Sequence, residues 1–423
     1  MAAAMRFVAA HATEEMLFAR GESIERCDPA TVVALLLAQM SAAPPFDWAV
    51  CFFTAHFMPI IEALASELCE ALGVPALIGC SAESVITTEH ELEQHPAITV
   101  LAARTPGVRV KPFALQAHSA AEWATLLSSE AAFREHLVGA HEPRLFILLV
   151  DPFTVPLIGR LPQQGGVLEA FNRFYAGVPV VGGVASGASV PGANALLLNR
   201  AVLRGGAVGL ALEGNVQIDV VVSQGCRPIG RPFRVTRTHQ HFILQLDEAP
   251  PFKQLEALIE SLSRAERERL VGSLLIGRLV QSEIFPPYAA FGRGDFVVRS
   301  VLGGDPETGA LAVGDLLEVG DIVQFHLRDA QTAREDLEML LAPQALLDPP
   351  KGMLLFACNG RGMRLYPHAD GDVRVVQAAL GESQDRPVPL AGFFCGGEIG
   401  PIRGRNFLHS YTASLAIFRP ARA

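Results

Sequence analysis

Apolar and polar residues alternate along the chain with two different periods. Short apolar runs with strand character alternate with longer stretches in which apolar residues recur every three or four positions, the spacing of an amphipathic helix. This alternation predicts an α/β, or mixed α+β, fold of two domains with mixed sheets, β-hairpins and flanking helices. The predicted strands cover residues 48–55, 74–86, 144–152, 178–188, 352–362 and 388–400, and the predicted helices cover residues 58–72, 166–175 and 335–347. Gly73 stands where the first of these helices should end, because glycine readily adopts the left-handed conformation of a helix C-cap.

One phrase occurs three times along the chain. It consists of an apolar strand, an intervening segment, the dipeptide Val-Pro, a few further residues, a glycine and a turn of small residues. The glycines are Gly79, Gly182 and Gly392. The phrase indicates an internal duplication, or else a chance resemblance between α/β units.

Hairpins and a long helix are expected between the second and third copies of this phrase. Residues 206–225 are predicted to form two paired strands around the turn residues 213–215, and residues 296–315 are predicted to form another hairpin. Residues 254–280 have the pattern of an amphipathic helix. The pair Pro250–Pro251 before it gives the predicted domain boundary, which divides the chain into residues 1–249 and 250–423.

Composition excludes several classes of protein. The chain has 423 residues, of which 50% are hydrophobic and 18% charged, so it can bury a large core and disorder is not its main state. Its net charge of −10 and the lack of a basic stripe argue against a nucleic-acid partner. No apolar run reaches about 18 residues, so no membrane span is expected. The beginning of the chain does not have the pattern of a signal peptide.

The seven cysteines are scattered and form no Cys-x-x-Cys pair. This pattern is typical of a protein of the reducing cytosol, so we expect a cytoplasmic location and seven reduced thiols.

Glycine-rich turns follow four of the apolar strands, in the segments GCSAES, GGVASGAS, CNGRG and CGGEIG. If the strands are parallel, their ends meet at one edge of a sheet, which is where α/β proteins place ligands. Backbone N–H groups and serine hydroxyls there would bind a polar ligand. We therefore expect the turns at Gly79–Ser81, Cys358–Gly362 and Cys395–Glu398 to converge on a shared cavity or interface. The alternative for each is a tight turn with a purely structural role.

Arg361 and Glu398 are the charged residues of these turns. An arginine binds a carboxylate and a glutamate binds an ammonium group, so together they would match the two charged ends of an amino acid. Alternatively, the two side chains pair with each other and hold two loops together.

The candidate site contains residues from all four turns. No motif of a hydrolase, nucleotide-binding protein or metalloenzyme surrounds them, so no catalytic residue and no cofactor is predicted. His239 and His241 alone make a poor metal site, so no metal is predicted. The candidate ligand-binding residues are Gly79, Cys80, Ser81, Gly183, Ser186, Cys358, Asn359, Arg361, Cys395 and Glu398.

Several segments resemble the FIST domain family. LFACNGRG, VPLAGFFCGGEIGPI and NFLHSYTASLAIF resemble its C-terminal domain, and ALIGCSAESVI, VPVVGGVASG and residues 206–250 are similar to its N-terminal domain. FIST domains occur in bacterial signal-transduction proteins and in a eukaryotic F-box protein, and they are regarded as sensory. The resemblance therefore implies a sensor of small ligands, with amino acids as proposed ligands.

The resulting hypothesis is a stand-alone FIST-type sensory module. It binds a small polar ligand, for which an amino acid is a candidate. No kinase, cyclase, methyl-accepting or F-box segment is recognised, so its output is expected to pass to a separate signalling protein. Two alternatives stay open: an enzyme that uses Cys80, Cys395 or Glu398, and a non-catalytic scaffold for protein interactions.

Overall fold

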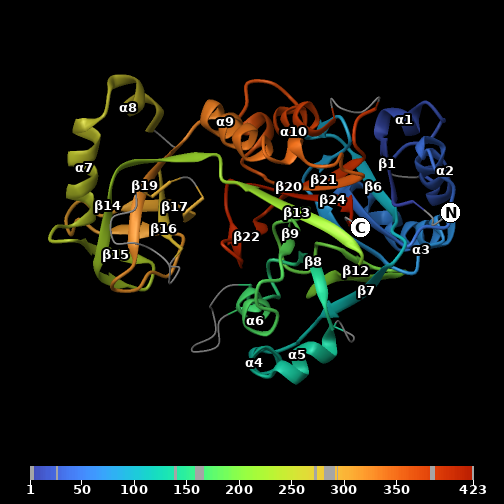
Figure 1. Ribbon diagram of the computed structural model, residues 1–423, viewed down its shortest axis with the longest axis horizontal. Coiled ribbons are helices and arrows are strands. Elements are labelled where there is room, and N and C mark those ends of the chain that lie inside the picture. Colours follow the sequence, from blue (N-terminus) through green and yellow to red (C-terminus); the bar gives the residue numbers. More distant parts are fainter. Residues whose placement is uncertain are drawn as a thin grey trace. The chain divides into compact units, whose positions relative to one another are not determined.

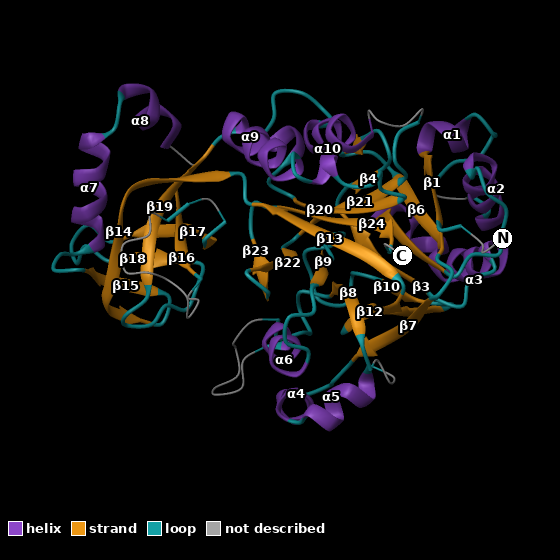
Figure 2. Cartoon of the chain, in the orientation of Figure 1, coloured by secondary structure: helices purple, strands orange, loops and turns teal. Residues whose placement is uncertain are grey.

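The computed structural model describes residues 4–24, 27–137, 141–157, 166–270, 274–280, 291–292, 294–381 and 386–421. The chain forms two compact units (Figure 1). Unit 1 combines Met1–Val222 with Glu338–Ala423, and unit 2 consists of Ser223–Leu337. Helices and strands occur in both units (Figure 2), so the predicted mixed α/β fold is confirmed.

Unit 1 is built from three successive repeats of one arrangement. Each repeat has a first strand of eight residues, a parallel pair of strands joined through a helix, a short β-hairpin and a closing strand. The first repeat contains β1 (Arg6–Thr13), α1 (Glu14–Phe18), α2 (Pro29–Gln39), β2 (Trp48–Thr54), the 3₁₀ helix η1 (Ala55–Ile60), α3 (Ile61–Leu72), β3 (Leu77–Ala82), the hairpin β4 (Val85–Ile86) and β5 (Glu91–Leu92), and β6 (Ala97–Arg104).

The other two repeats follow the same order. The second contains β7 (Val108–Leu115), α4 (Ala120–Ser128), α5 (Glu130–His136), β8 (Pro143–Val150), α6 (Val167–Phe174), β9 (Val180–Val184), the hairpin β10 (Leu196–Leu198) and β11 (Ala201–Leu203), and β12 (Ala207–Gly214). The third contains β13 (Val216–Ser223), α9 (Ala330–Leu341), η2 (Gln344–Leu346), β20 (Gly352–Cys358), η3 (Gly362–Arg364), α10 (Gly371–Gly381), β21 (Leu390–Cys395), the hairpin β22 (Glu398–Ile402) and β23 (Arg405–His409), and β24 (Ala413–Pro420).

Each repeat sends its hairpin to the sheet of another repeat. The first repeat's hairpin extends the sheet of the third, the second's extends the sheet of the first, and the third's extends the sheet of the second. This cyclic exchange interlocks the three repeats. The strand orders are β1-β6-β2-β3-β10-β11, β7-β12-β8-β9-β22-β23 and β13-β24-β20-β21-β4-β5.

One apolar core lies between the three sheets, and helices cover their outer faces. Successive residues of a strand face opposite sides. In β2, Trp48, Val50 and Phe52 therefore enter the central core, while the residues between them pack with the helices of the first repeat. Figure 1 shows α1–α3, α4–α6 and α10 on three different sides of the strands.

The three glycines of the repeated phrase occupy equivalent positions. Each lies in the second strand of a parallel pair, opposite a residue whose carbonyl oxygen would be only 1.8–2.2 Å from a Cβ at the glycine. No other residue type allows this approach of two backbones without a shift. The repeat predicted from the phrase is therefore confirmed. The register pairs are Gly79 with Cys51, Gly182 with Leu148, and Gly392 with Leu355.

Unit 2 is a closed barrel that the chain forms between β13 and β20 of the third repeat. Its strand order is β14-β15-β18-β17-β16-β19. Strands β17 and β18 form the predicted hairpin of residues 296–315. The elements are β14 (Cys226–His239), β15 (Phe242–Leu246), α7 (Pro251–Ser261), α8 (Arg264–Leu270), β16 (Leu274–Leu279), β17 (Phe296–Gly304), β18 (Leu311–Val313) and β19 (Ile322–Arg328).

The predicted hairpin of residues 206–225 is wrong in its pairing. Both strands exist, as β12 and β13, but β12 pairs with β7 and β8, whereas β13 belongs to the sheet of the third repeat. Gly214, with φ +105°, turns the chain from one sheet to another. The turn residues 213–215 are compatible both with a hairpin and with a chain that crosses to another sheet, so the sequence pattern does not distinguish the two.

The predicted helix of residues 254–280 is also only partly correct. It is divided into α7 and α8, and residues 274–279 form β16; residues 271–273 lie outside the described part of the chain. Ser263 and Glu266 begin α8 as a capping box, since the serine hydroxyl accepts the N–H of Glu266 and the glutamate accepts the N–H of Ser263. Gly73 ends α3 with φ +60°, as predicted.

The predicted domain boundary lies in front of α7, inside unit 2. The compact units follow a different partition, in which unit 2 begins at Ser223 and the chain returns to unit 1 at Glu338. The division into residues 1–249 and 250–423 separates two domains along the sequence, not two compact units of the structure, and it stays a prediction.

Replacing Gly392 by alanine should destabilise unit 1. The new Cβ would lie 1.8 Å from the carbonyl oxygen of Leu355, so the parallel pair must separate. We expect the free energy of unfolding to fall by about 3 kcal/mol, at the upper end of the range for overpacking. Denaturant unfolding measures this change. Gly396→Ala, whose Cβ would find its nearest neighbour at 3.6 Å, is the matched control; equal stability of the two variants would contradict the argument.

Candidate functional site

The three parallel pairs end side by side, and their outgoing segments bond to one another. The N–H of Ser186 donates to the carbonyl oxygen of Ser81 at 3.3 Å, and the Ser186 hydroxyl donates to that of Phe394 at 2.5 Å. The N–H of Phe394 donates to the carbonyl oxygen of Ser84 at 3.0 Å, which closes a ring of contacts between the three repeats. The ends of β3, β9 and β21 thus meet around one point.

Glycines make the closest of these contacts possible. A Cβ at Gly183 would lie 2.3 Å from the Sγ of Cys395. Gly396 donates its N–H to the carbonyl oxygen of Val184, and Val184 donates to that of Gly397. The glycines therefore have the structural role that was the alternative for each turn, namely the close packing of backbone on backbone.

The end of β20 joins the same cluster. Cys358 is the register partner of Cys395, and the N–H of Asn359 donates to the carbonyl oxygen of Cys395 at 3.0 Å. The turns at Gly79–Ser81, Cys358–Gly362 and Cys395–Glu398 therefore lie close together, and a shared cavity or ligand site between them stays a prediction. They meet at the junction of the three repeats.

Glu398 is the carboxyl group at this junction, and it is fully buried. It begins β22, opposite Gly183. Its Oε2 accepts the N–H of Thr412 at 3.1 Å, and the Cys358 thiol donates to the same carboxyl group. Its Oε1 has no hydrogen-bond partner in the described part of the chain. Burial raises the pKa of Glu398 to about 8, so the carboxyl is mostly protonated at neutral pH.

Comparison of the repeats shows that a carboxyl is not needed at this position for folding. In each repeat, the residue that follows the glycine of the repeated phrase pairs with one residue of an exchanged hairpin. These hairpin residues are Val85, Leu196 and Glu398. Val85 and Leu196 both belong to the central apolar core. Glu398 therefore replaces an apolar side chain in the third repeat. A buried polar group with an unused oxygen costs stability, so this replacement calls for a functional reason.

Arg361 has a different partner from either of those considered from the sequence. It forms a bidentate pair with Asp372, with Nε and Nη2 each 2.6 Å from a carboxylate oxygen. It also donates to the Tyr366 hydroxyl and to the carbonyl oxygen of Tyr411. Its side chain is fully buried. Arg361 thus clamps the loop between β20 and α10. It lies close enough to Glu398 to favour its ionised form, but it does not pair with it.

Glu91 is a further buried carboxyl of this region, and the sequence analysis missed it. It comes from the hairpin of the first repeat, and its Oε1 accepts the N–H groups of Asp372 and Val373 at the beginning of α10. Burial and the nearby Asp372 raise the pKa of Glu91 to about 8. The equivalent residues of the other hairpins, Val202 and Leu408, are apolar and pack against their helices. This role becomes visible only in the contact between Glu91 and Asp372, which are 281 residues apart in the sequence.

The remaining predicted residues have roles inside the fold. Ser81 donates its hydroxyl to Asn194 and accepts the N–H of Ala195. Gly79 lies against the β2 backbone, and the Ser186 hydroxyl also accepts the N–H of Glu83. Asn359 is half-buried, and its Oδ1 has no partner in the described structure. Asn359 and Glu398 therefore offer the unused polar groups of the predicted site, next to Cys358.

Cys80 and Cys395 are poor candidates for a catalytic nucleophile. Both side chains are fully buried. Burial raises the pKa of both thiols well above the ordinary value, so the reactive thiolate is disfavoured. The enzyme hypothesis that uses these cysteines therefore finds no support in their surroundings.

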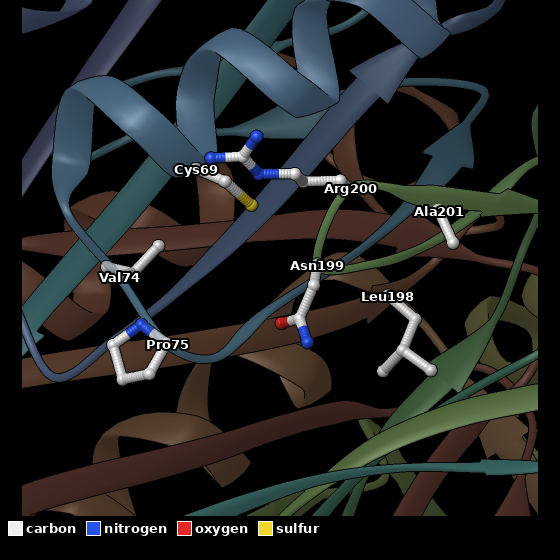
Figure 3. Close-up of a pocket in the computed structure, with 7 residues that line it drawn as sticks. All are labelled: Cys69, Val74, Pro75, Leu198, Asn199, Arg200 and Ala201. Atoms are coloured by element: carbon white, nitrogen blue, oxygen red, sulfur yellow. The ribbon is translucent and has the colours of Figure 1, made fainter.

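A cavity of about 460 Å³ lies elsewhere in unit 1, beside α3 and the β10–β11 hairpin (Figure 3). None of the ten candidate residues lines it. Figure 3 shows Arg200 extending towards Cys69, and Asn199 uses its Oδ1 to accept the N–H of Leu77. The lining residues are Cys69, Val74, Pro75, Leu198, Asn199, Arg200 and Ala201.

The described residues contain no group of three or more histidine, cysteine, aspartate or glutamate side chains placed to hold a metal ion. Among their helices, none has the length and apolar character that a membrane crossing requires.

Loss of the Arg361 side chain should strongly destabilise the protein. In Arg361→Met, Asp372 keeps its burial but loses its cationic partner, and we expect the free energy of unfolding to fall by about 3–5 kcal/mol. Arg364→Ala is the control, because Arg364 and Glu83 form an exposed pair worth less than about 1 kcal/mol. Chemical denaturation compares the two variants, and equal losses would show that the buried clamp is not a stabilising element.

Glu398→Gln should change how stability depends on pH. Since the folded-state pKa of Glu398 is raised, the folded protein holds this proton more tightly than the unfolded chain, and stability falls as pH rises from the unfolded pKa to about 8. Glutamine resembles the neutral acid and cannot ionise. Relative to wild type, the variant should gain roughly 2–3 kcal/mol between pH 6 and pH 8, at up to about 1.4 kcal/mol per pH unit.

The same measurement on both proteins isolates Glu398. The neighbouring Arg361, Cys358, Cys395 and His409 and the second raised carboxyl, Glu91, are present in both, so their titration cancels in the difference. A difference in unfolding free energy that stays constant with pH would mean that Glu398 has an ordinary pKa.

Comparisons with known proteins place this arrangement in a family. Residues 47–249 match the FIST N domain and residues 255–401 match the FIST C domain. All ten candidate residues lie within these matches. An uncharacterized protein of Mycobacterium bovis is 38% identical over 366 residues, which cover 86% of this chain and 88% of that protein. An uncharacterized protein of Mycobacterium tuberculosis is 39% identical over 345 residues, covering 81% of this chain and 83% of the relative. The chain therefore belongs to the FIST family, whose domains are sensory domains of signal transduction.

Proposed function

We propose that this FIST protein senses a small ligand with a cationic amine group. The ligand binds where Cys358 and Asn359, at the end of β20, lie next to Glu398, at the beginning of β22. The observation that carries the proposal is the unused Oε1 of Glu398, a fully buried oxygen at a position that is apolar in the other two repeats. Cys358 and Asn359, which lie next to this position, are half-buried.

The chemistry of the unused groups favours a ligand that donates hydrogen bonds. Glu398 Oε1 and Asn359 Oδ1 are both acceptors without partners among the described residues. An ammonium group supplies several donors and a positive charge, so it satisfies a carboxylate that is otherwise costly to bury. Binding then converts the neutral Glu398 carboxyl into a carboxylate and releases its proton.

An amino acid remains a candidate ligand, but Arg361 is not available to bind its carboxylate. The guanidinium group is held by Asp372, Tyr366 and a backbone carbonyl. The amine is therefore the part of the ligand that we assign to the site. Comparison of amino acids with their decarboxylated amines tests whether the carboxylate contributes.

The position of the site offers a way to transmit a signal. Glu398 belongs to the hairpin that the third repeat sends to the sheet of the second, and the ring of hydrogen bonds beside it reaches the first repeat. A ligand that pulls on Glu398 would therefore act on all three repeats. Passage of this change to a separate signalling protein is part of the proposal and rests on the sensory role of the family.

A thermal-shift screen of amino acids and small amines tests the proposal. A ligand at about 100 times its Kd should add roughly 2.7 kcal/mol to the stability of the wild-type protein. This gain should disappear in Glu398→Gln, which keeps the size of the side chain but cannot form a carboxylate. Glu89→Gln, at an exposed position, is the matched control and should respond like wild type.

The pH dependence of binding gives a second readout of the same prediction. Since Glu398 must lose a proton, affinity should rise about tenfold per pH unit below its pKa of about 8 and level off above it, as long as the ligand amine stays protonated. Equal stabilisation of wild type and Glu398→Gln by every active ligand would refute the proposed site.

A further inference from the structure

Three reactive side chains meet at the end of the β20–β21 pair. Cys358 and Cys395 are register partners on adjacent parallel strands, so their side chains project from the same face of the sheet. The Cys358 thiol donates to the Glu398 carboxyl, and the charges of Cys358 and Glu398 both act on Cys395. The two thiols and the carboxyl are therefore mutual neighbours.

The backbone spacing at this pair suits a disulfide. Adjacent strands lie about 4.8 Å apart. Disulfides join residues whose Cα atoms are about 4.4–6.8 Å apart. The Sγ of Cys395 donates only a weak hydrogen bond, at 3.5 Å, to the carbonyl oxygen of Phe393, and it packs closely against the backbone of Gly183.

Cys358 differs from the other thiols in its surroundings. Six of the seven cysteines are buried, whereas Cys358 is half-buried. Its sulfur accepts the N–H of Gly360 at 3.4 Å, and its thiol donates to the Glu398 carboxyl. Cys358 is therefore the more accessible thiol of the pair, and Cys395 lies beside it in the core.

We propose that Cys358 and Cys395 form a reversible disulfide when the protein meets a hydroperoxide. Cys358 reacts first, and Cys395 is the resolving thiol. This inference does not rest on the proposed amine ligand, because the reaction needs only the protein and the peroxide.

The reaction balances in two steps. In the first, which starts from the ionised form of Glu398, Cys358 gives its proton to the Glu398 carboxylate and its sulfur attacks the peroxide. An S–O bond forms, the O–O bond breaks, and the departing oxygen leaves as water or alcohol with that proton. In the second, the sulfur of Cys395 attacks the Cys358 sulfenic acid. The S–S bond forms, the S–O bond breaks, and the hydroxyl leaves as water with the Cys395 proton. Two electrons pass from the two thiols to the peroxide.

Thiol counting and peptide mapping test the proposal on the full chain without any added amine. After treatment of the reduced protein with one equivalent of hydrogen peroxide, the number of free thiols should fall from seven to five. Non-reducing digestion and mass spectrometry should find one linked pair, Cys358 with Cys395. A dithiol reductant should restore seven thiols.

Single substitutions separate the two roles. Cys395→Ser should stop at a Cys358 sulfenic acid that dimedone traps, and Cys358→Ser should keep its six thiols. Cys80→Ser is the matched control, because Cys80 is also a buried neighbour of Cys395, and it should still form the Cys358–Cys395 link. Seven remaining thiols in treated wild type, a Cys80–Cys395 link, or a Cys358 sulfinic acid without a link would each overturn the proposal.

Discussion

The close contact of backbone with backbone at the junction of three repeats is the constraint on which the rest of unit 1 depends. Each parallel pair is held so tightly that a glycine must face a carbonyl oxygen of its partner strand, at Gly79, Gly182 and Gly392. Beyond these glycines the three chains cross to neighbouring sheets and bond to one another. The junction is therefore closely packed, and the Glu398 side chain placed there is fully buried despite its polarity.

Acidic residues occupy two hairpin positions in this setting that are apolar in the equivalent hairpins of the other repeats. Glu398 takes the position of Val85 and Leu196, and the hairpin residue Glu91 takes that of Val202 and Leu408. The Arg361–Asp372 clamp organises the loop between them. Because the three repeats share one backbone plan, the difference cannot be a requirement of the fold. At Glu398, this difference is the basis for the ligand site that we propose.

The sequence predicted the framework better than the site. The phrase around Gly79, Gly182 and Gly392 predicted the repeat, because each of these glycines is required by the close approach of a neighbouring backbone carbonyl. The partner of Arg361 could not be read from the sequence, since Asp372 is one of many acidic residues and only the fold brings it close. The role of Glu91 could not be predicted for the same reason. Its hairpin belongs to the first repeat but pairs with the sheet of the third, where Glu91 contacts Asp372. Pairing between distant segments is set by topology, which no local pattern records.

The central claim is that Glu398 is a buried acid that stays protonated at neutral pH until a cation binds it. Carbon-13 NMR of protein labelled in its glutamate carboxyl groups measures this directly, and Glu398→Gln identifies the signal by its disappearance. The account predicts that this carboxyl titrates with a midpoint near pH 8. A midpoint close to the ordinary glutamate value of about 4.3 would show an ionised, solvated carboxyl and contradict the account.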